Sequence, residues 1–154
     1  SIKMRRNFLK ILIKTLGVII FTPCNFVYAE TKKIINNNLT KEQKEILFNE
    51  GTEKPFTSAL LHEKRKGFYH CANCGNKLFS SDSKFDSGTG WPSFSEALPG
   101  AFKTKVDFSF GIMRTEYHCA KCGAHHGHVF NDGPTKTKKR FCNNGLCLIF
   151  KPST

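Results

Sequence analysis

Two stretches of the sequence decide the fold: Tyr69-His70-Cys71-Ala72-Asn73-Cys74-Gly75 and Tyr117-His118-Cys119-Ala120-Lys121-Cys122-Gly123. They are identical at all but one position, and each contains Cys-x-x-Cys followed by glycine. Two residues between cysteines allow both sulfurs to face one ion, and the glycine permits a tight turn beyond them. The pattern predicts one structural Zn²⁺ held by four thiolates; two disulfides or a thioredoxin-like redox motif are the alternatives. The predicted ligands are Cys71, Cys74, Cys119 and Cys122.

A closed site of four cysteines leaves no open coordination position, so its role is predicted to be structural. The two halves lie 48 residues apart along the chain, which is more than a single zinc ribbon needs. They are therefore expected to clamp together two separate parts of a sheet. The histidines near these motifs are expected to be surface residues. These are His62, His70, His118 and His126.

Length and composition restrict the fold class. The chain has 154 residues, of which 39% are apolar and 23% charged, and this predicts one globular domain. There is no room for a multidomain enzyme or a nucleotide-binding α/β fold. Lys and Arg total 24 against 12 Asp and Glu, a formal charge of +12.

The first 29 residues have the layout of a secretory signal peptide. They contain no acid, and basic residues precede the apolar run from Ile11 to Ile20. Small or tolerated residues then surround a cleavage position at Ala29. Arg5-Arg6 resembles a twin-arginine export motif. We expect export to the periplasm or the medium, with an uncleaved membrane anchor as the alternative. A linker is expected over residues 30–39 and the folded domain over residues 40–151.

Local patterns predict a mainly antiparallel β fold with one short helix. Thr40 and Gln43 have the spacing of a capping box, and the helix that follows is expected to end at Gly51. Val106, Phe108, Phe110 and Ile112 alternate with polar residues and glycine, which predicts a strand with one buried face. The apolar stretch from Phe141 to Phe150 predicts another strand.

Once the zinc ligands and Cys24 are set aside, Cys142 and Cys147 remain. On a strand, Arg140, Cys142 and Asn144 project from the same face. A nearby guanidinium favours the thiolate form of cysteine, which is the nucleophile. Cys147 is expected to face the other side as a small buried hydrophobe.

Aromatic and imidazole groups complete a candidate site. The only tryptophan, Trp91, lies in a turn-rich segment with Phe94 nearby, and His125 and His128 follow the second Cys-x-x-Cys motif. A thiolate, histidines, an amide and an aromatic wall together suggest nucleophilic catalysis on a small apolar group.

From Thr40 to Phe150 the sequence resembles the methionine-R-sulfoxide reductase family, also called the MsrB or SelR domain. The matching stretches are Gly51-Thr52-Glu53-Lys54-Pro55-Phe56, the two Cys-x-x-Cys motifs, Phe85-Asp86-Ser87-Gly88-Thr89-Gly90-Trp91-Pro92-Ser93-Phe94, Gly123-Ala124-His125-His126-Gly127-His128-Val129-Phe130 and Arg140-Phe141-Cys142-Asn143-Asn144. The resemblance implies a small β fold of the Mss4-like β-tent type, with a structural zinc away from the active site. It also implies reduction of the R epimer of methionine sulfoxide, free or in oxidised proteins that need repair.

The resemblance also implies a role for individual residues. Cys142 is the nucleophile that attacks the sulfoxide sulfur and becomes a sulfenic acid. Trp91, grouped with Phe94 as substrate-binding, receives the methyl group. His125 and His128 bind or protonate the sulfoxide oxygen, and Arg140 and Asn144 orient and activate the thiolate.

The chain departs from the family where many members have a resolving cysteine, because Thr89 occupies that position. Cys147 is a poor substitute, since five residues of strand span roughly 16 Å and a disulfide needs Cα atoms within about 7 Å. The expected reductant is therefore a thioredoxin-like protein or a small thiol, and the expected state is a monomer. The alternative function is a zinc-ribbon module that binds nucleic acid through the basic cluster Lys136, Lys138, Lys139 and Arg140. Nucleic acid is not an expected partner of the reductase.

Overall fold

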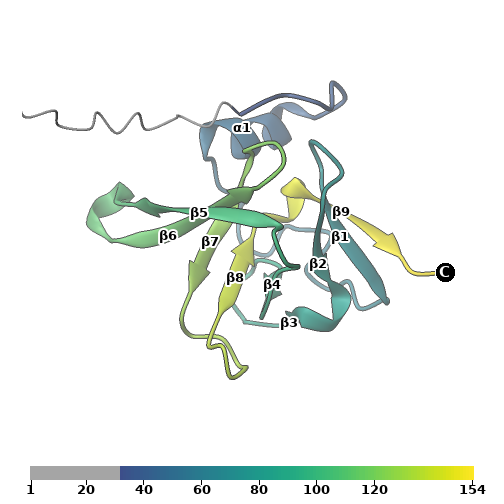
Figure 1. Cartoon of the computed structure of the whole chain (residues 1–154), viewed down its shortest axis with the longest axis vertical. Helices are drawn as coiled ribbons and strands as arrows, with labels where there is room; N and C mark the ends of the chain where they lie inside the picture. Colours follow the sequence, from purple (N-terminus) through teal and green to yellow (C-terminus); the bar gives the residue numbers. More distant parts are fainter. Residues whose placement is uncertain (1–31) are drawn as a thin grey trace, which may run out of the picture.

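The computed structural model describes residues 32–154, and in them the predicted mainly antiparallel β fold with one short helix is confirmed (Figure 1). The strands form a three-stranded sheet of order β2-β1-β9 and a six-stranded sheet of order β3-β4-β8-β7-β6-β5. The predicted signal peptide, with Cys24, lies outside the described residues. Within residues 32–154, no helix combines the length and apolar character needed to cross a membrane.

Three strands form the smaller sheet and six strands form the larger one. The smaller sheet contains β1 (Gly67–Cys71), β2 (Lys77–Ser80) and β9 (Leu148–Pro152). The larger sheet contains β3 (Lys84–Phe85), β4 (Ser93–Phe94), β5 (Phe102–Asp107), β6 (Arg114–Cys119), β7 (His125–Phe130) and β8 (Arg140–Asn143). Short 3₁₀ turns occupy η1 (Ser81–Ser83), η2 (Ser109–Gly111) and η3 (Gly145–Cys147).

The helix α1 (Lys41–Asn49) begins as the capping box predicts. The Thr40 hydroxyl accepts from the Gln43 backbone N–H at 3.1 Å, and the Gln43 side chain accepts from the Thr40 N–H at 3.0 Å. Its end differs from the prediction, because Glu50 rather than Gly51 takes the left-handed conformation, with φ 58°. Lys32 and Lys105 bind the Glu50 carboxylate, and these ion pairs help to offset the cost of that backbone conformation.

Aromatic side chains from both sheets fill the core between them. The Phe79 and Phe94 rings stack with centroids 4.0 Å apart, and Tyr69 meets Phe94 edge-on at 4.9 Å. Tyr69 and Phe79 come from the smaller sheet and Phe94 from the larger one. The core therefore holds the two sheets together through stacked rings.

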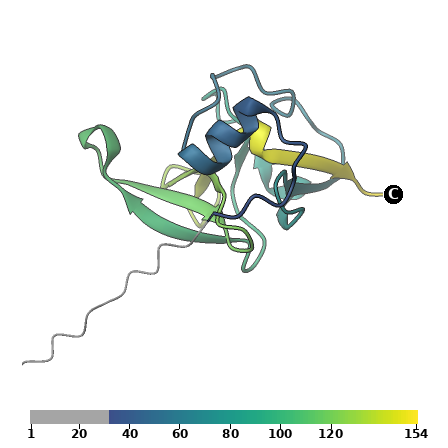
Figure 2. The same cartoon turned by 90° about the horizontal axis from the view of Figure 1, so that it is seen from above.

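The predicted strand over residues 106–112 is wrong. Strand β5 ends at Asp107, the chain turns through η2, and Phe110 takes a left-handed φ of 62°. The β5–β6 hairpin projects away from the rest of the molecule (Figures 1 and 2), so no second layer covers its apolar side chains. Consequently Phe108 is 70% exposed and Phe110 is 90% exposed.

The predicted strand from Phe141 to Phe150 is also interrupted. It is divided into β8 and β9 by the turn η3, and the two strands belong to different sheets. The buried Glu53 carboxylate accepts backbone N–H bonds from Gly145 at 2.6 Å and Leu146 at 3.2 Å. The Glu53 carboxylate thus satisfies two backbone N–H donors at the start of η3 that would otherwise be unpaired. These bonds stabilise the turn through which the chain passes from the larger sheet to the smaller one.

Candidate functional site

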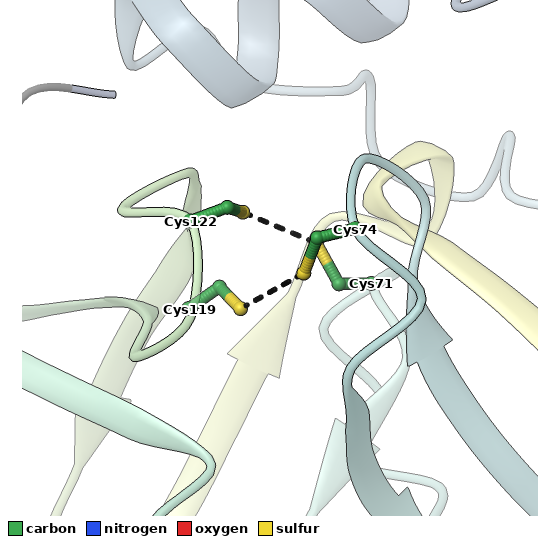
Figure 3. Close-up of side chains that lie close together, drawn as sticks. All are labelled: Cys71, Cys74, Cys119 and Cys122. Atoms are coloured by element: carbon green, nitrogen blue, oxygen red, sulfur yellow. Dashed lines mark hydrogen bonds between the residues drawn. The ribbon is translucent and has the colours of Figure 1, made fainter. Parts of the chain in front are cut away.

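The four motif cysteines come together as the sequence predicts (Figure 3). Their Sγ atoms all lie within 4.8 Å of one another, with 3.8 Å between Cys71 and Cys122 and 3.6 Å between Cys74 and Cys119. Tetrahedral Zn–S bonds of about 2.3 Å place sulfurs about 3.8 Å apart, whereas a disulfide needs about 2.0 Å. All four thiols are free. The donor set and spacing fit a tetrahedral metal ion better than either alternative.

The cluster connects the two sheets. Cys71 ends β1 in the smaller sheet, and Cys119 ends β6 in the larger one. The prediction that the motifs clamp two parts of one sheet is therefore corrected, because they join separate sheets. Each motif turns at a glycine with φ 72°, which a residue with a side chain adopts only with strain. These glycines are Gly75 and Gly123.

The histidines near the cluster differ in exposure. His62 is exposed as predicted, and His70 is half-buried. The surface position predicted for His126 is wrong, since it is fully buried with Nε2 3.4 Å from Cys71 Sγ. Burial lowers the pKa of His126 to about 3, so the ring is neutral and can donate one N–H to that sulfur. Such a donor orients a metal-binding thiolate.

Away from this cluster, Cys142 opens into a cavity of about 190 Å³. The predicted residues Trp91, His128 and Asn144 share the cavity with it. The indole of Trp91 is fixed because its Nε1–H donates to the Glu53 carbonyl at 2.9 Å. The complete lining is Thr52, Trp91, Arg114, Gly127, His128, Phe130, Cys142 and Asn144.

Close strand packing shapes the cavity floor. Gly127 on β7 pairs with Asn143 on β8, and a Cβ at this glycine would lie 1.9 Å from the Cys142 carbonyl oxygen. A side chain there would force the strands apart and displace Cys142. Glycine at this position thus keeps the thiol at its observed depth in the cavity.

Opposing influences act on the Cys142 thiol. Burial raises its pKa, while the Arg140 charge and hydrogen bonds from Thr89 and Arg140 lower it. Asp132 holds the Arg140 guanidinium through two contacts, at 2.7 and 2.9 Å. Arg140 is therefore both charged and fixed next to the sulfur, as the sequence predicted. Because it is engaged here, Arg140 is not available to the basic cluster of the nucleic-acid alternative.

A row of hydroxyls continues from Cys142 through Thr89. Thr89 Oγ1 lies 2.8 Å from Ser87 Oγ, which lies 2.7 Å from Ser93 Oγ, and Ser93 is 3.0 Å from the Trp91 carbonyl. Each hydroxyl has one hydrogen and the Trp91 carbonyl only accepts, so the row satisfies every contact when it points toward that carbonyl, and pointing it toward Cys142 costs one of those bonds. A thiol can donate into it, and a thiolate can accept from it after the hydroxyls rotate.

The two predicted histidines have different surroundings. His128 Nε2 lies 2.7 Å from Asp107 Oδ2, and burial lowers the pKa of His128 although Asp107 opposes that shift. His125 is almost fully buried with Nδ1 2.8 Å from Glu116 Oε1. It lines a second cavity of about 270 Å³, which shares Thr52, Arg114 and His128 with the first. Only His128 of the pair borders the Cys142 cavity.

Two predicted site residues have structural contacts. Phe94 is fully buried in the aromatic core and lines no part of the Cys142 cavity, so its predicted substrate contact is wrong. The Asn144 side chain accepts from the Glu53 N–H at 2.9 Å and donates to the His126 carbonyl at 3.0 Å. Its amide therefore fixes the backbone beside Cys142.

Cys147 is fully buried, as predicted for a small hydrophobe. Burial raises its pKa well above the usual range, and it does not line the Cys142 cavity. The separation of roughly 16 Å expected between Cys142 and Cys147 applies to a continuous strand. The turn η3 interrupts that strand, so this separation does not apply to the folded chain.

Several cavity residues were not predicted from the sequence. Thr52, Arg114 and Phe130 contribute to the lining, and Asp107 and Glu116 hold the histidines. Thr52 and Phe130 lie in stretches that resemble the family, but nothing in those stretches indicates that their side chains border the cavity. Asp107 and Arg114 face each other across the β5–β6 ladder, a pairing that required the hairpin turn to be recognised.

Comparison with known proteins identifies extensive similarity. The profile of the SelR domain family matches residues 39–152. A protein named peptide methionine sulfoxide reductase MsrB from Variovorax paradoxus is 55% identical over 108 residues, covering 70% of this chain and 79% of that protein. Proteins of the same name from Leptospira interrogans and Methanosarcina barkeri are 52% and 50% identical, covering 82% and 79% of this chain and 98% and 84% of theirs. A crystal structure of the Mis18 "Yippee-like" domain matches with a TM-score of 0.48 at 15% identity, covering 58% of this chain and 99% of that one.

Proposed function

This chain belongs to the SelR domain family and is a peptide methionine sulfoxide reductase, and we propose that it reduces the R epimer with Cys142 as the nucleophile. The observation that carries the proposal is one cavity lined by Cys142, Trp91 and His128. It combines a thiol, an aromatic wall and a proton donor. A sulfoxide needs all three, since its sulfur accepts a soft nucleophile only when its oxygen is polarised.

The reaction begins with attack of the Cys142 thiolate on the sulfoxide sulfur. His128 supplies a proton to the sulfoxide oxygen as negative charge develops there. The sulfur–oxygen bond of the substrate breaks and the oxygen ends on the Cys142 sulfur. Methionine leaves as the reduced thioether, and Cys142 is oxidised to a sulfenic acid.

Residues around the cavity orient this step. The Trp91 indole and the Phe130 ring form an apolar wall for the substrate methyl group, and this fixes which epimer directs its oxygen toward His128. Arg140 and Thr89 favour the thiolate. His125 lies behind His128, with ring centroids 5.7 Å apart, and acts through it.

The direct test uses Cys142→Ser with separated R and S epimers of methionine sulfoxide and dithiothreitol as reductant. The wild-type protein reduces the R epimer, while the serine variant loses turnover to the background rate and retains its bound metal. Continued turnover by the variant, or a preference of the wild type for the S epimer, contradicts the assignment.

We further propose that an external thiol, from a thioredoxin-like protein or a small molecule, reduces the sulfenic acid. Thr89 has no sulfur, and the buried Cys147 lies outside the cavity. Mass spectrometry after one turnover without reductant should therefore find an oxygen adduct on Cys142. A disulfide between Cys142 and Cys147 contradicts this proposal.

The remaining proposals concern the metal, the compartment and the assembly. Four thiolates at these distances favour Zn²⁺, which would be held by the Cys-x-x-Cys motifs and would supply structural stability only. Elemental analysis should find one zinc per chain.

The basic and apolar pattern of residues 1–29 supports export, which N-terminal sequencing of the native protein tests. We propose a monomer, to be tested by sedimentation.

A further inference from the structure

The end of the β5–β6 hairpin is the most exposed apolar region among the described residues. We call residues 106–113 the hairpin tip. Its exposed fractions are 57% for Val106, 70% for Phe108, 90% for Phe110, 64% for Ile112 and 73% for Met113. Only four other large apolar side chains of the described chain are comparably exposed, and they are scattered. Soluble proteins rarely leave such a group of side chains in water without a use for it.

The base of the hairpin is fixed to the active site. Asp107 pairs with Arg114 across the ladder at 2.7 Å and holds His128 at the same distance. Phe110 lines the second cavity, which adjoins the Cys142 cavity because Thr52, Arg114 and His128 line both. The hairpin tip therefore lies next to the site that contains the sulfur.

We propose that the hairpin tip docks the apolar residues that flank methionine sulfoxide in an extended polypeptide, an inference that rests on the proposed function. When the sulfoxide side chain enters the Cys142 cavity, the substrate backbone must cross its rim. An extended chain advances about 3.3 Å per residue, so the residues that flank the sulfoxide lie outside the cavity, on the rim that the hairpin tip adjoins. Apolar neighbours there bury surface against Phe108 and Ile112.

Charge favours a polypeptide over an anionic membrane as the occupant. The cations at the hairpin base are already paired, because Lys105 binds Glu50 and Glu116, and Arg114 binds Asp107. Lipid-binding loops combine apolar residues with basic residues that face the anionic headgroups. The tip offers apolar contacts without those charges, which suits an apolar peptide segment.

The test compares substrates rather than overall activity. One variant combines Phe108→Ser with Ile112→Ser, and a second combines Val106→Thr with Met113→Gln. Phe110 stays unchanged because it lines the cavity beside the histidines. The substrates are free methionine-(R)-sulfoxide, a peptide with leucines around the sulfoxide, and the same peptide with serines instead. Ile149→Ser, on exposed β9, is the matched control.

For both tip variants we expect kcat/KM on the leucine peptide to fall by about tenfold, mainly through KM. Activity on the free sulfoxide should stay within about twofold, and the control should match wild type. An equal loss on all three substrates, or no loss, overturns the docking proposal. The proposal is also overturned if the variants keep the wild-type ratio of kcat/KM between the leucine and serine peptides but lose binding to phosphatidylcholine–phosphatidylglycerol vesicles or lose self-association. The tip would then contact a membrane or a second copy of the chain. If wild type reduces none of the substrates, the proposed function itself has failed.

Discussion

At the residue scale, the protonation of Cys142 depends on a few atoms. Burial favours the neutral thiol, and Arg140 and Thr89 favour the thiolate. The Thr89 hydroxyl can donate to the sulfur while it accepts from Ser87, at the cost of one hydrogen bond elsewhere in the row of hydroxyls that ends at the Trp91 carbonyl. In the proposed reaction we therefore expect the Thr89 hydroxyl to help hold Cys142 as the thiolate.

Replacing Thr89 by valine tests that contribution. Loss of a hydrogen bond that favours the charged form should raise the pKa of Cys142. The acidic limb of the pH profile of kcat/KM then moves to higher pH, and alkylation of Cys142 by iodoacetamide moves with it. Thr89→Ser keeps the hydroxyl and should restore the wild-type profile. An unshifted limb in the valine variant would show that Thr89 only fills space.

His128 depends in the same way on Asp107. Burial lowers the pKa of His128, and the Asp107 carboxylate counteracts that shift by stabilising the protonated ring. Asp107→Asn removes the charge at nearly constant shape, so the pKa of His128 should fall further. If the protonated ring is the acid, the alkaline limb of activity moves to lower pH, and turnover at pH 7 falls by about tenfold. A loss that is equal at every pH would indicate a structural role for Asp107 instead.

At the scale of elements, Glu50 ties the end of α1 to the hairpin. Hydrogen bonds from Lys105 and Lys32 lower its pKa from 4.5 to about 2 in the folded protein. A folded-state pKa below the unfolded value means stability that is present above about pH 4.5 and lost as the pH falls toward 2. Glu50→Gln should therefore lower the free energy of unfolding at pH 7 by less than about 1 kcal/mol, because the pair is solvent-screened.

Urea unfolding of wild type and Glu50→Gln at several pH values measures this difference. The gap should be largest near neutrality and close at the acidic end. A gap that persists unchanged to pH 2 would mean that the glutamine disturbs the left-handed end of α1 rather than the ion pairs.

Elements governed by short-range chemistry were predictable from the sequence. The capping box at Thr40 and the two Cys-x-x-Cys turns depend on neighbours within a few residues, and both form as expected. The prediction for residues 106–112 was wrong because a period-two pattern predicts a strand without showing whether a second layer covers it, and the prediction for residues 141–150 was wrong because an apolar stretch does not show where a strand is interrupted. The hairpin has no such layer, and η3 exists because Glu53, about 90 residues away, holds its amides.

The candidate site also contains both residues that short motifs mark and residues that long-range packing places. Cys142, Trp91 and His128 belong to motifs that sequence patterns and family resemblance mark, and they meet in one cavity. Phe94 lies in such a motif but faces the core, since alternate strand residues point to opposite sides. Arg114 reaches the cavity through the pairing of β5 with β6, and the stretch that contains Thr52 does not indicate by itself that this side chain borders the cavity.

At the scale of the whole molecule, the Cys-x-x-Cys motifs are the point where the two sheets are joined. One motif ends β1 in the smaller sheet and the other ends β6 in the larger sheet. Cys142 lies on β8 in the larger sheet, and the chain then crosses through η3 to the smaller one. Separation of the sheets would therefore disturb the backbone next to Cys142, although the four motif cysteines do not line its cavity.

Removing the metal should consequently abolish activity by unfolding. Because the folded state alone holds the four thiolates together, binding energy contributes directly to folding, and Cys74→Ala should lose the ion and several kcal/mol of stability. Elemental analysis, thermal unfolding and activity on the R epimer are measured together. Cys142→Ala, the matched control, should lose activity but retain both metal and stability. Cys147→Ala should retain metal and activity with only a small loss of stability, since it leaves a small cavity in the core. A metal-free Cys74→Ala protein that unfolds at the wild-type temperature would show that the aromatic core alone holds the sheets together.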